Sequence, residues 1–148
     1  MGKNTVEIKI KYFNEEMERL RLIDGKSDWV DLRAAETVTL KKGDYYAIPL
    51  GVAMKLPEGY EAHVVPRSST FKNYGLIMVN SVGIIDNSYC GPEDQFHMPV
   101  FATRDTVVHF NDRICQFRIM ENQPPVVFVE DDLTSEMNRG GFGSTGKK

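Results

Sequence analysis

Residues 80–91 read Asn80-Ser81-Val82-Gly83-Ile84-Ile85-Asp86-Asn87-Ser88-Tyr89-Cys90-Gly91. This segment places a carboxylate and an aromatic ring directly after a short apolar stretch. An apolar wall beside a carboxylate can tune it as a general base. Aspartate followed by asparagine and serine is also common in solvated turns. The residues alone therefore leave both interpretations of Asp86 open.

A second polar group lies upstream, where Pro66-Arg67-Ser68-Ser69 follows the strand-like residues 62–65. A guanidinium group and two hydroxyls at the end of a strand can bind an anion. An exposed turn with an incidental arginine would have the same sequence. The tetrapeptide is a candidate anion site that needs support from other motifs.

The C-terminal segment 139–148 is rich in glycine, with four glycines in ten residues. Ordering such a segment alone costs much conformational entropy. Residues 141–147 match most of the G-x-x-x-x-G-K pattern of a P-loop, but Lys148 stands where that pattern requires Ser or Thr. We expect residues 1–138 to form a single β domain and residues 139–148 to form a flexible lid that orders over a ligand.

Short strand-like runs separated by turn residues dominate the rest of the chain. Residues 6–12 alternate apolar and charged side chains, which is typical of a strand with one buried face. Many such runs predict an all-β sandwich, barrel or jelly roll rather than a βαβ fold. Residues 14–23 are the best candidate for a short helix. The other predicted strands are 37–40, 45–48, 52–56, 61–65, 76–79, 98–102, 107–110, 114–120 and 126–129.

The composition narrows the class of protein. A chain of 148 residues suits one domain. Its formal charge of -3 lacks the basic footprint of a nucleic-acid binder. No apolar run approaches the roughly 18 residues of a membrane span. The two cysteines, Cys90 and Cys115, form neither a zinc spacing nor a disulfide framework, so we expect reduced thiols and a cytoplasmic location.

Taken in order, five segments of the chain resemble the five motifs of the trimeric dUTP nucleotidohydrolases (dUTPases). The chain departs from the family in two places. Asp28-Trp29 replaces the usual Ala-Gly before the first motif, and Asn111 and Cys115 replace Gly and Ala in the fourth. The five segments are residues 31–34, 66–69, 80–91, 111–116 and 139–146.

The resemblance implies a homotrimer of distorted jelly-roll subunits that hydrolyses dUTP to dUMP and pyrophosphate with Mg²⁺. Asp86 would deprotonate the water that attacks the α-phosphorus. Tyr89 would pack on the deoxyribose and exclude a 2′-hydroxyl. Asp31 would meet the triphosphate-bound Mg²⁺ through water, and Phe142 would cap the uracil ring. The other implied substrate-binding residues are Arg67, Ser68, Ser69, Asn80, Gly83, Ile84, Ile85, Gln116, Arg139, Gly143, Ser144 and Thr145.

The resemblance also implies active sites shared between subunits. One subunit would supply the third motif, a second subunit would supply the second and fourth motifs, and a third subunit would supply the tail. Two alternatives stay open. A dCTP deaminase has the same fold but needs a catalytic glutamate near the base, and the nearby Glu93 follows Gly91-Pro92 in the wrong place. The second alternative is a regulatory protein that binds a protein partner. Trp29 and the insert from Pro92 to Phe101 receive no role.

Overall fold

The computed structural model describes residues 5–22, 26–143 and 146. Within them the chain forms antiparallel strands and one short helix, α1(Thr70–Tyr74), so the all-β prediction is confirmed. The strands are β1(Lys9–Tyr12), β2(Val30–Arg33), β3(Val38–Leu40), β4(Tyr45–Pro49), β5(Val52–Lys55), β6(Tyr60–Pro66), β7(Leu76–Met78), β8(Gly83–Ile85), β9(His97–Ala102), β10(Thr106–Val108) and β11(Arg113–Glu121).

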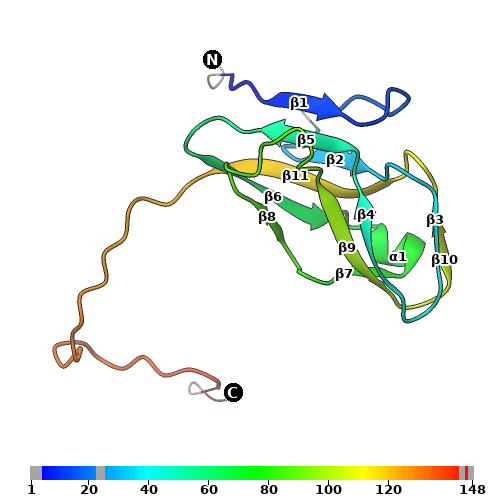
Figure 1. The fold of residues 1–148 in the computed structure, drawn as a ribbon. Helices are drawn as coiled ribbons and strands as arrows, with labels where there is room; N and C mark the ends of the chain where they lie inside the picture. The colour runs from blue at the N-terminus through cyan, green and yellow to red at the C-terminus, as the bar shows by residue number, and fades with distance from the viewer. Residues whose placement is uncertain (1–4, 23–25, 144–145, 147–148) are drawn as a thin grey trace.

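The strands form a four-stranded sheet in the order β2-β11-β6-β8 and a three-stranded sheet in the order β4-β9-β7. Two further pairs, β1-β5 and β10-β3, complete the body. Figure 1 shows β11 and β6 side by side, with α1 close to the end of β6 that leads into it. Buried apolar side chains from all four groups of strands join in one core.

Burial alternates from one residue to the next along the strands, as β9 illustrates. Met98, Val100 and Ala102 are buried, whereas the intervening side chains reach the surface. Successive side chains of a strand point to opposite faces, so this pattern buries one face only. The predicted strands from residue 6 to residue 120 overlap β1, β3, β4, β5, β6, β7, β9, β10 and β11.

The helix predicted over residues 14–23 is wrong for the described residues 14–22, which form a turn and irregular chain. The Asn14 carboxamide accepts a hydrogen bond from the Glu16 amide at 2.8 Å. Such local side-chain bonds compete with helix formation. The buried Met17 packs beside Gly51, whose φ of +71° suits glycine and where a Cβ would collide with the Met17 sulfur. Packing on the body therefore overrides the helical pattern.

The chain leaves the body after β11, and all described residues from 123 to 143 are exposed (Figure 1). The strand predicted at residues 126–129 is therefore wrong for the single chain. The exposed segment starts well before residue 139, and the division into a domain and a lid stays a prediction. In the described part of the chain, no helix has the length and apolar character that crossing a membrane requires.

Candidate active site

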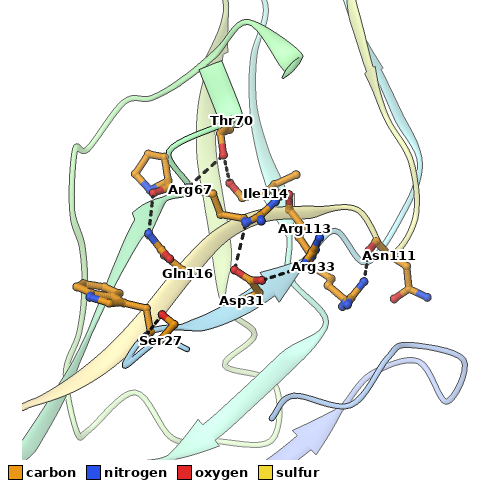
Figure 2. A network of polar contacts seen from close by, with 11 residues as sticks. Ser27, Asp31, Arg33, Arg67, Thr70, Asn111, Arg113, Ile114 and Gln116 are labelled. Carbon is orange, nitrogen blue, oxygen red and sulfur yellow. Dashed lines mark hydrogen bonds and ion pairs between the residues drawn. The ribbon is translucent and has the colours of Figure 1, made fainter. Parts of the chain in front are cut away.

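Asp31 of β2 lies at the centre of a network of charged groups (Figure 2). Its Oδ1 is 3.1 Å from Arg67 Nε, and its Oδ2 is 3.3 Å from Arg113 Nη1. Asp31 faces Gln116 across the β2–β11 ladder, so the two side chains share one face of the sheet. Strand pairing thereby joins the first, second and fourth sequence motifs.

Arg67, Ser68 and Ser69 follow the last residue of β6 in a tight turn that leads into α1. The turn is closed by two hydrogen bonds between its ends. The Thr70 amide donates to the Arg67 carbonyl, and the Arg67 amide donates to Thr70 Oγ1, both at 3.1 Å. Ser68 is exposed at the corner, with its hydroxyl available to a ligand.

A cavity of about 300 Å³ opens beside this turn and Asp31. Three predicted site residues besides Asp31 line it, namely Arg67, Ser68 and Gln116. Gln116 also donates a long hydrogen bond to the Pro66 carbonyl at 3.4 Å. The five arginines of the lining outnumber its two acidic residues, so the cavity favours an anion. Those arginines are Arg19, Arg21, Arg33, Arg67 and Arg113.

A second hollow of about 390 Å³ contains the predicted catalytic carboxylate, Asp86. Asp86 directly follows β8 and is exposed; its Oδ1 accepts a hydrogen bond from the Ser88 amide at 3.2 Å. Ile84, Ile85 and Tyr89 line the same hollow. The carboxylate therefore lies beside apolar side chains and has access to solvent.

Contacts of both its hydroxyl and its ring fix Tyr89 within this hollow. Its hydroxyl donates to the Gln95 carbonyl at 2.7 Å, and its ring centroid lies 6.4 Å from that of the buried Phe96. Burial and, to a smaller extent, the charge of Asp94 raise the pKa of Tyr89 above its usual value. The hydroxyl therefore stays neutral at physiological pH, and the ring presents a fixed wall.

β8 is an edge strand of the four-stranded sheet within the described residues. It pairs with β6 on one side, with Ile84 opposite His63. Gly83 is buried, and a Cβ there would lie 3.2 Å from Met78 Cε and 3.4 Å from Val64 Cβ. The preceding turn contains Asn80 and Ser81, and Ser81 has a φ of +60°. The other edge of β8 can offer main-chain groups to a planar ligand.

The tail places its predicted residues away from both hollows. Arg139, Phe142 and Gly143 are exposed and line neither cavity. Ser144 and Thr145 lie outside the described residues. The two hollows also share no lining residue among those described. One chain therefore presents three separate pieces of the predicted site: the arginine-rich cavity, the Asp86 hollow and the tail.

The sequence profile of the dUTPase family matches residues 29–146. The chain is 54% identical over 143 residues to the SPbeta prophage-derived deoxyuridine 5'-triphosphate nucleotidohydrolase YosS of Bacillus subtilis, covering 97% of this chain and 100% of that protein. This chain belongs to the dUTPase family.

Solved structures agree with this family in fold. A dUTPase of Staphylococcus bacteriophage 80alpha with dUPNHPP has a TM-score of 0.77 at 20% identity, over 97% of this chain and 100% of that one. A mutant dUTPase from phage phi11 of S. aureus, described with a structural Mg(II) ion, has a TM-score of 0.70 at 18% identity, over 86% and 99%. The predicted jelly-roll class of the dUTPases is confirmed.

Several residues of this region received no role from the dUTPase motifs. Trp29, Arg33 and Arg113 line the arginine-rich cavity, and the buried Thr70 is hydrogen-bonded to the lining residue Arg67. Arg33 and Arg113 stand inside the first and fourth motifs, so their position in those segments was the available signal. Trp29 lines the cavity, and Arg118 lies 5.7 Å from its ring centroid. Thr70 follows the second motif directly, and nothing in its sequence context distinguished it.

Proposed function

We propose that this chain hydrolyses dUTP to dUMP and pyrophosphate. The observation that carries the proposal is the convergence of Asp31, Arg67, Ser68 and Gln116, from three dUTPase motifs, on one cavity rich in guanidinium groups. Such a cavity suits a triphosphate, whose charge calls for several fixed donors. The name of the B. subtilis relative supplies the nucleotide and the reaction.

In this proposal Asp86 takes a proton from the attacking water, which adds in line to the α-phosphorus as pyrophosphate leaves. Its exposure gives the water access, and the Ser88 amide fixes one carboxylate oxygen. Arg67, Ser68, Ser69 and Gln116 hold the phosphates. Catalysis then rests mainly on positioning and on electrostatic stabilisation of the leaving group.

The uracil ring lies against the free edge of β8, read by main-chain groups of Gly83, Ile84 and Ile85 with Asn80 beside them. The Tyr89 ring packs on the deoxyribose and excludes a 2′-hydroxyl. A site that bonds one edge of a base strongly rejects a base with other donors and acceptors. Phe142 covers the ring, and Arg139, Gly143, Ser144 and Thr145 close over the phosphates.

Mg²⁺ fits this donor set as an ion that arrives with the triphosphate. Among the described residues no cluster of three or more His, Cys, Asp or Glu could hold a metal ion. Mg²⁺ commonly keeps its waters and binds substrate phosphates with only one or two carboxylates. Asp31 is the carboxylate that would contact it through water, and the bound ion would neutralise phosphate charge.

We further propose a homotrimer whose sites are shared between subunits, because one chain presents the site in three separate pieces. Neighbouring copies would bring the Asp86 hollow, the arginine-rich cavity and the tail together. A cytoplasmic location fits the two free cysteines, one exposed and one buried. A protein regulator would be a further partner.

Pyrophosphate release from dUTP, dCTP, dTTP and UTP tests the function. We expect dUTP to be preferred by at least about 10³-fold, with loss of activity when EDTA removes Mg²⁺. Ammonia release from dCTP would instead identify a deaminase, although the exposed Glu93 does not line the Asp86 hollow. Binding of dUTP without turnover would identify a regulatory protein.

A further inference from the structure

Thr70 is the one fully buried polar side chain among the described residues, at 1% exposure. It is the first residue of α1 and follows the turn that presents Arg67, Ser68 and Ser69. A polar group at this depth requires hydrogen-bond partners. Its partners show what the residue connects.

The first partner is the turn itself. Oγ1 of Thr70 accepts from the Arg67 amide at 3.1 Å, while the Thr70 amide donates to the Arg67 carbonyl at 3.1 Å. These reciprocal bonds fix both backbone groups of Arg67. Ser68 and Ser69 lie between the bonded ends, so the path of their backbone is fixed too.

The second partner is β11. The Thr70 hydroxyl donates to the Ile114 carbonyl at 2.7 Å (Figure 2). Ile114 lies where the pairing of β11 with β2 shifts register, and it precedes Cys115, the first residue of β11 paired with β6. A bulged residue is left outside the regular ladder, and Thr70 provides the partner for its carbonyl.

We infer that Thr70 is a positioning residue that aligns the phosphate-binding turn with Gln116 and Arg113 of β11. The inference rests on the proposed function. A single hydroxyl accepts from Arg67 and donates to Ile114, so it joins two segments that each supply donors to the arginine-rich cavity. Serine keeps both capacities, whereas valine has the same shape and neither capacity.

The test compares Thr70→Val and Thr70→Ser in the full chain. The kcat/KM for dUTP of T70V should fall about 10- to 100-fold, because small misplacements of binding groups are costly. T70S should stay within about threefold of wild type. The affinity of T70V for pyrophosphate should fall as well. This affinity can be measured by the fluorescence of Trp29, the single tryptophan, which lines the same cavity.

Thr103→Val is the matched control. The Thr103 hydroxyl also donates to a carbonyl at 2.7 Å, that of Gly75, at the other end of α1. T103V should lose stability without losing pyrophosphate affinity or kcat/KM. An equal loss in T103V would show that T70V acts through general destabilisation and would overturn the inference. So would a folded T70V with wild-type kinetics.

Thr70→Cys covers the case in which T70V does not fold, because a thiol of similar size is a weak donor and acceptor. The kcat/KM and the pyrophosphate affinity of T70C should be lower than those of wild type and T70S. Both values should be higher than those of T70V. Wild-type values in T70C would reject the positioning role. A wild-type protein that neither turns over dUTP nor binds pyrophosphate would reject the proposed function instead.

Discussion

Arg67 Nε lies 3.1 Å from Asp31 Oδ1, so a residue of the second motif is held by a residue of the first. Both side chains keep about a quarter of their surface exposed, at 26% and 29%. Ion pairs with this much solvent contribute little to stability, about 0–1 kcal/mol. The pair therefore matters for geometry, since it directs the guanidinium group along the wall of the arginine-rich cavity.

Replacing Asp86 with asparagine tests the general base. The amide cannot take a proton, so turnover of dUTP should fall about 10²- to 10⁴-fold. Thermal stability and binding of a non-hydrolysable dUTP analogue should be retained. The control is Asp105→Asn. The Asp105 carboxylate accepts a hydrogen bond from the Lys42 amide at 2.8 Å, and Asp105 lines neither the Asp86 hollow nor the arginine-rich cavity. Turnover of D86N within a few-fold of wild type would show that another group is the base.

Replacing Tyr89 with alanine tests sugar selection. Removal of the ring opens the hollow beside Asp86, so the ratio of kcat/KM for dUTP to that for UTP should fall. Tyr89→Phe keeps the ring but loses the 2.7 Å hydrogen bond to the Gln95 carbonyl, and it should retain most of the selectivity. If Y89A and wild type had the same selectivity for dUTP over UTP, the Tyr89 ring would not be the group that excludes the 2′-hydroxyl.

Ending the chain after Asn138 tests the lid. Residues 139–143 are exposed and lie away from the core, so the melting temperature should stay within a few degrees of wild type. Hydrolysis of dUTP should nearly vanish, because Arg139 and Phe142 are removed. A large drop in melting temperature would show instead that the tail is a structural element of the assembled protein.

Mixing two inactive variants tests the shared site. Asp86→Asn chains with intact tails are refolded together with chains that keep Asp86 but end after Asn138. If the tail closes over another subunit, mixed trimers contain some complete sites and activity should return above that of either parent. Mass measurements confirm the mixed assemblies. Mixed trimers without activity would mean that each tail serves its own subunit.

The sequence predicted most strands because their burial alternates locally, but it could not predict contacts made through strand pairing. The first motif implies that Asp31 meets the triphosphate-bound Mg²⁺ through water, yet its partner Arg113 lies 82 positions away and meets it only through the β2–β11 ladder. The role of Thr70 likewise depends on the bulge at Ile114. Conversely, residues 126–129 have a strand-like pattern, and the single chain gives them no neighbouring strand.

In a chain without its neighbours, the exposed stretch Val126-Val127-Phe128-Val129 is prone to self-association. Phe128 is 93% exposed and its valine neighbours are at least half exposed, a composition that pairs readily into intermolecular sheets. Glu130, Asp131 and Asp132 follow at once and act as charged gatekeepers. The hydrogen bond from the Thr134 amide lowers the pKa of Asp132, so this repulsion persists further into acid than an ordinary aspartate would allow.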